Sequence, residues 1–206
     1  PSKRLVLIEL DHPSSQQTLQ LYPAAGCCAV SWVVGGRDCL HLSQPLEQFL
    51  REEHTGGLPL LYPWANRLRS NTWSFHDRSV DLSGMPGVHR DGNGLPMHGL
   101  LLRWADWKLS VEGNICSASI EWSDHERLMQ AFPFPHRLQV DWLLDEKGLE
   151  VTTTIEARDR PVPVSFGWHP YLVLPGVARE GITLDLPSLS RVTLDSAGLP
   201  IDRSPE

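Results

Sequence analysis

The sequence predicts an all-β protein built as a large antiparallel β-sandwich. Three observations favour this class: apolar residues alternate with period two along the chain, helical periodicity occurs in one short segment, and turns rich in Gly and Pro separate the alternating runs. We expect each run to form a half-buried strand. The alternating positions are Leu19 and Leu21; Trp107, Leu109 and Val111; Ala118, Ile120 and Trp122; Leu138, Val140, Trp142 and Leu144; Leu149, Val151, Thr153 and Ile155.

Local signals place one hairpin and one helix among these strands. The turn at 146–148 joins the last two runs, and Gly148 supplies the positive φ that a short bulged turn requires, so the two strands are expected to pair antiparallel. Apolar residues within Pro45–Glu53 are spaced like one face of a helix, with Ser43 in the position of a cap.

The chain is expected to form one domain over residues 1–206, because no internal repeat or change of composition divides it. Ser83–Pro96 is rich in Gly, Pro, Asp and Asn, which predicts a long loop, and loops of this length usually carry function. Strand-like alternation at 182–184 and 192–194 continues close to residue 206 with no closing element behind it. We therefore expect the domain to be incomplete at its C-terminus.

Composition and charge disfavour several classes of partner. The chain carries 18 Lys and Arg against 25 Asp and Glu, a net charge of -7, and has no basic cluster that would bind nucleic acid. Its apolar runs fall short of the roughly 20 residues of a membrane span, and its N-terminus lacks the pattern of a signal peptide. We expect a cytoplasmic protein with no membrane partner.

The four cysteines are expected to be reduced and buried. Cys27, Cys28, Cys39 and Cys116 contain no CxxC pair, and the adjacent Cys27 and Cys28 point to opposite faces of a strand. Free cysteine usually behaves as a small apolar residue.

Common catalytic motifs are missing from the sequence, which has no GxSxG elbow, P-loop or GxGxxG fingerprint. His125-Glu126 begins like the zinc-protease motif HExxH, but Met129 stands where the second histidine is needed. We expect no zinc site there.

Three clusters combine rigid turn residues with polar side chains. The first, LPLLYPWANRL at 58–68, ends in Asn66 and Arg67 behind two prolines. The second, LPMHGLLLRW at 95–104, places His98 at the expected start of a strand, before a glycine that permits a close backbone approach. The third, VPVSFGWHPYLVLP at 162–175, contains His169 before a proline that keeps its backbone extended. Taken singly, each of these polar residues is as well explained by a structural or surface role.

In this order, the clusters resemble the aldose 1-epimerase (galactose mutarotase) family over nearly the whole chain. The resemblance rests on GGxPLLxPWxNR at 56–67, HG at 98–99 followed by Trp104, FPF at 132–134, HPY at 169–171 and LDLPSLSRVTLDSAGLP at 184–200. It implies a β-supersandwich whose concave face binds a monosaccharide, and a reaction that interconverts the α and β anomers of a free hexose. Neither a metal nor a redox cofactor is implied.

The resemblance also implies roles for particular residues. Arg67 matches a substrate-binding arginine, His98 matches a histidine that contacts the sugar near its reacting end, and His169 matches the general acid. Asn66 is a weaker candidate for a sugar contact.

This sequence departs from the family pattern in one respect. The family's general-base glutamate and a sugar-binding aspartate lie farther along the chain than these 206 residues extend, and neither Glu180 nor Glu206 stands in a matching context. Two alternatives therefore stay open. One is a hexose-phosphate mutarotase, with Arg67, Arg69 and Arg90 as candidate phosphate ligands. The other is a noncatalytic carbohydrate-binding domain.

Overall fold

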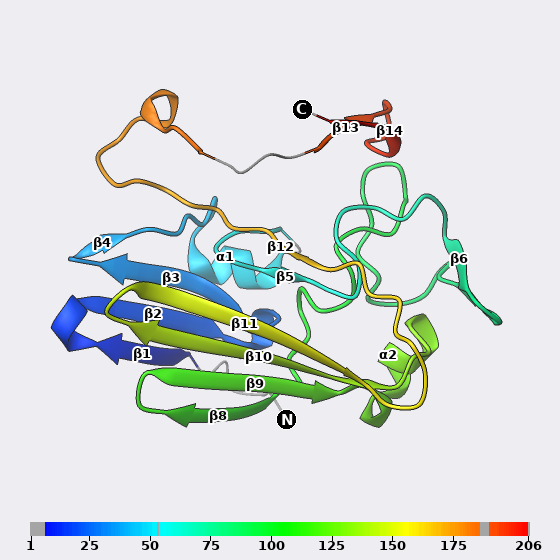
Figure 1. Ribbon diagram of the computed structural model, residues 1–206, viewed down its shortest axis with the longest axis horizontal. Coiled ribbons are helices and arrows are strands. Elements are labelled where there is room, and N and C mark those ends of the chain that lie inside the picture. Colours follow the sequence, from blue (N-terminus) through cyan, green and yellow to red (C-terminus); the bar gives the residue numbers. More distant parts are fainter. Residues whose placement is uncertain (1–6, 53, 186–189, 206) are drawn as a thin grey trace.

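Two four-stranded antiparallel sheets form the centre of the structure, a computed structural model that describes residues 7–52, 54–185 and 190–205 (Figure 1). The first sheet contains, in spatial order, β1 (Ile8–His12), β2 (Gln17–Tyr22), β3 (Cys28–Val34) and β4 (Arg37–Asp38). The second contains β11 (Gly148–Ala157), β10 (His136–Asp145), β9 (Ile115–Glu121) and β8 (Lys108–Glu112). The expected all-β architecture is confirmed.

The larger of two apolar clusters lies between the two sheets. Alternate residues of β10, including Leu138, Val140 and Trp142, are at most 1% exposed, as are Leu19 and Leu21 of β2. The amide of Gln17 links the sheets at one end, where its Nε2 donates to the carbonyl of Asp145 over 2.8 Å. The period-two pattern thus identified the faces that meet.

The predicted hairpin joins β10 to β11. The strands pair from His136 opposite Ala157 to Asp145 opposite Gly148, and Gly148 has a φ of 137°. In the turn, Oδ1 of Asp145 accepts hydrogen bonds from the backbone N–H groups of Lys147 (2.7 Å) and Gly148 (3.1 Å).

Two expected strands differ from the prediction. β8 forms, but Leu109 and Val111 are 42% and 48% exposed rather than half-buried, because both faces of this edge strand are left uncovered by the described residues. Residues 182–184 form no strand in the described part of the chain, because no neighbouring strand pairs with them, and Leu184 is 74% exposed. In the LDLPSLSRVTLDSAGLP motif, residues 186–189 lie outside the described residues.

The expected helix forms as α1 (Leu46–Arg51), although Ser43 does not cap it; the N-cap residue is Pro45. At its C-terminal end the guanidinium of Arg103 donates to the carbonyls of Phe49 and Glu52. A second helix that the sequence did not predict, α2 (Glu126–Ala131), occupies the HExxH-like segment. Short 3-10 helices are η1 (Pro13–Ser15), η2 (Pro23–Ala25), η3 (Trp122–Asp124) and η4 (Arg179–Gly181).

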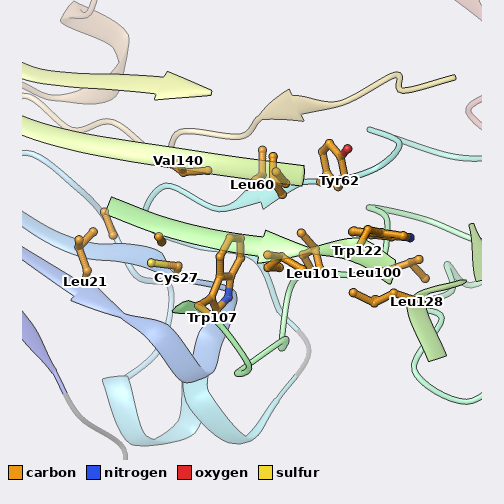
Figure 2. Close-up of a cluster of buried hydrophobic side chains, with 14 of the residues drawn as sticks. Leu21, Cys27, Leu60, Tyr62, Leu100, Leu101, Trp107, Trp122, Leu128 and Val140 are labelled. Atoms are coloured by element: carbon orange, nitrogen blue, oxygen red, sulfur yellow. The ribbon is translucent and has the colours of Figure 1, made fainter. Parts of the chain in front are cut away.

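The strand that leads to the polar clusters is β5 (Leu60–Leu61), which lies between two prolines and pairs with β12 (Gly167–Trp168). Figure 2 shows Leu60 between Val140 and Tyr62 in the buried cluster. The Tyr62 hydroxyl lies 2.6 Å from Nε2 of His136, whose Nδ1 lies 2.6 Å from the carbonyl of Phe134. Burial raises the pKa of Tyr62 and lowers that of His136, so this neutral pair fixes β5 to β10.

The remaining elements lie at the periphery. They are the hairpin of β6 (Thr72–Phe75) with β7 (Arg78–Asp81) and the hairpin of β13 (Ser190–Leu194) with β14 (Pro200–Pro205). Between β12 and η4 the described chain runs across one side of the molecule and forms no strand, only an isolated bridge at Leu172 (Figure 1). Along it, Leu172 and Leu174 are 61% and 53% exposed.

The sequence predicted reduced, buried cysteines and no membrane span. All four cysteines are free thiols, and three are buried as expected, whereas Cys39 is partly exposed. Among the described residues, no helix has the length and apolar character that a membrane span requires.

Candidate active site

Asn66 and Arg67 lie where the chain turns after β5. Trp64, which precedes them, is only 4% exposed, so it packs in the core and offers no aromatic face to a ligand. Asn66 is exposed and has a φ of 53°, a left-handed conformation that asparagine tolerates better than most residues. Arg67 forms an antiparallel bridge with Met97, which brings the second cluster alongside the first.

The sequence had predicted His98 at the start of a strand, but the residue lies in a bend between the two bridge residues Met97 and Gly99. Its φ is 63°, and its N–H donates to the carbonyl of Asn66 over 2.8 Å. Gly99 follows with a φ of 75°, and a Cβ there would lie 2.1 Å from the carbonyl oxygen of Tyr62. Left-handed backbone at a non-glycine residue is uncommon and often marks functional sites. The close approach at Gly99 fixes the direction of the His98 side chain.

His169 follows β12 directly and is held by its backbone and by a ring contact. Its N–H donates to the carbonyl of Pro59 over 3.1 Å. Its imidazole stacks on Tyr171 with centroids 4.8 Å apart and planes 15° apart. The Tyr171 hydroxyl in turn lies 2.5 Å from Oγ1 of Thr55. The third cluster is thereby tied to the start of the first one and to the residues just before it.

The fold brings the two predicted histidines together. The ring centroids of His98 and His169 lie 5.9 Å apart, with the planes at 82°. On its other side His98 lies parallel to His89, with centroids 6.0 Å apart and planes 6° apart. Residues that are 71 positions apart in sequence, 169 minus 98, therefore share one site.

The surroundings of His98 keep its imidazole neutral. Burial is the main cause that lowers the pKa of His98 to about 4, and its neighbours His169, His89 and Arg67 act in the same direction. Its Nδ1 is buried and has no hydrogen-bond partner among the described residues. We assign the proton to Nε2, because a buried N–H without an acceptor is costly. His98 can then donate one hydrogen bond to a ligand without carrying a charge.

Arg67 forms an ion pair that the sequence did not indicate. Its Nε donates to Oδ2 of Asp91 over 2.6 Å, and its Nη1 donates to Oδ1 of Asn66 over 2.8 Å. The side chain of Asp91 is 4% exposed, and that of Arg67 is 28% exposed. The hydrogen bond from Arg67 lowers the pKa of the Asp91 carboxyl, so both groups are charged at neutral pH.

The described residues contain no cluster of three or more His, Cys, Asp or Glu side chains placed to hold a metal ion. What the site does contain is a neutral histidine, a second partly exposed histidine and a fixed guanidinium. Such groups can donate hydrogen bonds to hydroxyls and exchange protons with oxygen atoms.

The sequence of the chain matches a known protein family. The family model for aldose 1-epimerase matches residues 7–205, which include every element described above. The chain belongs to the aldose 1-epimerase family. No curated protein matches it in sequence.

Solved structures show the same fold at low identity. A galactose mutarotase-like protein from Clostridium acetobutylicum is 19% identical over 99% of this chain, with a TM-score of 0.74. A galactose mutarotase-like protein from Lactobacillus casei is 16% identical over 97%, with a TM-score of 0.70. A Synechocystis protein is 22% identical over 82%, with a TM-score of 0.68. The chain covers 66%, 64% and 55% of these three proteins respectively, less than two thirds of each.

Four further residues of this aldose 1-epimerase family member surround the site without having been singled out from sequence. Two of them, His89 and Asp91, lie in the long loop at 83–96, which the sequence did mark as functional. Their spacing of two residues could have indicated that both face the site, since side chains at i and i+2 of an extended segment point the same way. Tyr171 belongs to the HPY motif, but its partner Thr55 carried no signal.

Proposed function

We propose that the protein is a cofactor-independent aldose 1-epimerase that interconverts the α and β anomers of a free hexose. The observation that carries the proposal is the approach of His98 and His169 to within 5.9 Å, beside a fixed Arg67, in a chain of this family. Three residues suited to a neutral polyhydroxyl ligand, two histidines and an arginine, thus converge from three separate segments.

Ring opening requires one proton to leave the anomeric hydroxyl while another reaches the ring oxygen. In our proposal His169 is the acid that protonates the ring oxygen, because it is partly exposed and its imidazole is held in one orientation by Tyr171. His98, neutral at physiological pH, donates a hydrogen bond to an oxygen near the reacting carbon. Rotation about the C1–C2 bond and reversal of the proton transfers would then close the ring as the other anomer.

Arg67 and Asn66 are proposed to bind hydroxyl groups away from the reacting carbon. Asn66 is exposed and bonded to Arg67, so the two side chains would act as one polar surface. Because the Arg67 side chain is 28% exposed, a sugar hydroxyl is proposed to reach it without displacing the ion pair with Asp91.

The base of the reaction is proposed to be a carboxylate other than those of the described residues. Among the described residues, the neighbours that shift the pKa of His98 are His169, His89 and Arg67, none of which is a carboxylate, and Asp91 is already bound to Arg67. We likewise propose that further strands complete a single β-sandwich domain. The exposed side chains of Leu172, Leu174 and Leu184, and the greater length of the solved relatives, support this.

A free hexose is favoured over a hexose phosphate by the contacts of the other arginines. Arg90 donates to Asn71 and to the carbonyls of Gly94 and Leu82, and Arg69 donates to the carbonyl of Pro200 over 2.8 Å. A phosphate dianion would have to displace these neutral acceptors to recruit either guanidinium. The four free thiols support a cytoplasmic location for the protein.

Polarimetry of freshly dissolved α-D-glucose and α-D-galactose with the full-length protein tests the proposal. We expect the approach to the equilibrium rotation to be faster than in buffer, and slower for hexose 6-phosphates than for the free sugars. A protein that binds these hexoses in calorimetry without accelerating their mutarotation would instead be the noncatalytic carbohydrate-binding domain.

A further inference from the structure

The loop that carries His89 and Asp91 is anchored on the side that faces away from the site. Its central residue, Arg90, donates to the side chain of Asn71 and to the carbonyls of Leu82 and Gly94, and it forms a backbone bridge with Pro96. Side chains alternate along extended backbone, so His89 and Asp91 project opposite to Arg90. His89 reaches His98, and Asp91 reaches Arg67.

The two carboxylate oxygens of Asp91 have separate partners. Oδ1 accepts the backbone N–H groups of Asn93 (2.9 Å) and Leu95 (3.0 Å), which closes the turn at the tip of the loop. Oδ2 accepts the Nε of Arg67 at 2.6 Å. The carboxylate is therefore held rigidly by the loop before it meets the guanidinium, and its side chain is only 4% exposed.

The guanidinium of Arg67 is confined on several sides. Asp91 holds Nε and Asn66 holds Nη1, while Gly198 packs so closely that a Cβ there would lie 3.0 Å from Nη1. These contacts use Nε and Nη1, so we assign to Nη2 the hydrogen bond that Arg67 would donate to a sugar hydroxyl. An arginine side chain left without such contacts would lose rotamer entropy each time it bound a ligand.

We propose that Asp91 is a positioning residue that holds Arg67 in the orientation needed to bind a sugar hydroxyl. The inference rests on the proposed function, in which Arg67 contacts the sugar, and adds a determinant of hexose affinity that does not touch the substrate. Because Arg67 acts away from the reacting carbon, Asp91 affects the binding of sugar more than its turnover.

The variant Asp91→Asn isolates this role. Asparagine keeps an Oδ1 that can accept the N–H groups of Asn93 and Leu95, but it replaces Oδ2 by an NH2 group that cannot accept from Arg67. Asp145→Asn is the matched control, because Oδ1 of Asp145 accepts two turn N–H groups in the same way at the β10–β11 hairpin. Thermal unfolding of both variants reports whether each turn is preserved.

We expect Asp91→Asn to raise the KM for hexose about tenfold, with kcat within about twofold of wild type, and Asp145→Asn to change neither. The effect must also depend on Arg67. In an Arg67→Met background, Asp91→Asn should raise KM no further, because the side chain on which it acts is gone. A KM that rises equally in both backgrounds, or that does not rise at all, overturns the proposal.

Two further measurements keep this test separate from that of the proposed function. If the wild-type protein binds hexose but does not accelerate mutarotation, the proposed function fails, and the same cycle is measured on the dissociation constant by calorimetry. If Asp91→Asn does not fold, Asp91→Glu retains the charge while moving the carboxylate by one methylene group. A raised KM with unchanged kcat in that variant supports the proposal, and an unchanged KM overturns it.

Discussion

The imidazoles of His98 and His169 lie 5.9 Å apart with their planes nearly perpendicular, at 82°. His98 is directed by a left-handed turn beside Gly99, whereas His169 is directed by stacking on Tyr171. Because the two rings are oriented by independent contacts, each can be replaced without reorienting the other. This independence allows their roles to be separated by mutation.

Replacement of His169 should abolish turnover but leave sugar affinity largely intact. In His169→Asn the proposed acid is lost, and we expect kcat to fall by about 10²-fold or more while KM changes little. Polarimetry over a range of hexose concentrations measures both constants. His76→Asn, at an exposed turn between β6 and β7, is the control. If kcat of His169→Asn stays within a few-fold of wild type, His169 is not the acid.

Stability should fall with decreasing pH because His98 resists protonation in the folded chain. Its pKa is about 4 when folded, against about 6.5 for an unperturbed histidine. Between these values the unfolded chain binds more protons, so the free energy of unfolding decreases as the pH falls from about 6.5 to about 4. His136, whose pKa burial also lowers, acts in the same direction.

The variant His98→Asn separates the contributions of His98 and His136 to the pH dependence of stability. It removes the titration of His98 and leaves that of His136, so its melting temperature should fall less than that of wild type between pH 7 and pH 5. Equal decreases in the two proteins would contradict the low pKa of His98.

Sequence reasoning succeeded where one chain segment determined its own structure. The alternation in β10 and β11 predicted the central hairpin, and Gly148 marked its turn. It failed where burial depends on a neighbour, as at Leu109 and Val111, whose apolar pattern is the same whether or not another layer covers the strand.

The site was predicted in part for a similar reason. Arg67, His98 and His169 stood in motifs whose order resembles a family, and the fold brings the two histidines together. Asp91 was missed because its role depends on a contact with Arg67, 24 residues earlier in the chain. Nothing in the local sequence distinguishes a turn-forming aspartate from one that also binds an arginine.

The hydrogen bond between Tyr62 and His136 should contribute measurably to stability. Both side chains are fully buried, and Tyr62→Phe would leave Nε2 of His136 without its partner at the centre of the core. We expect the free energy of unfolding to decrease by about 1–3 kcal/mol. Urea denaturation measures the change, and Tyr22→Phe, at a buried tyrosine outside this pair, is the control. Equal losses in the two variants would show that the bond to His136 adds nothing.

Gly99 should tolerate no side chain, because its backbone lies in close contact with that of Tyr62. The position of the neighbouring His98 depends on this contact. In Gly99→Ala the new Cβ would lie 2.1 Å from the carbonyl oxygen of Tyr62, at a φ of 75°. Relief of this clash must move the backbone beside His98, so we expect a loss of more than about 3 kcal/mol in the free energy of unfolding.

Gly84→Ala provides the comparison, since its φ is 65° but nothing lies within 4 Å of the added Cβ. There only the cost of the left-handed backbone remains, about 1 kcal/mol. Equal losses at the two positions, measured by urea denaturation, would mean that the contact with Tyr62 does not constrain the site.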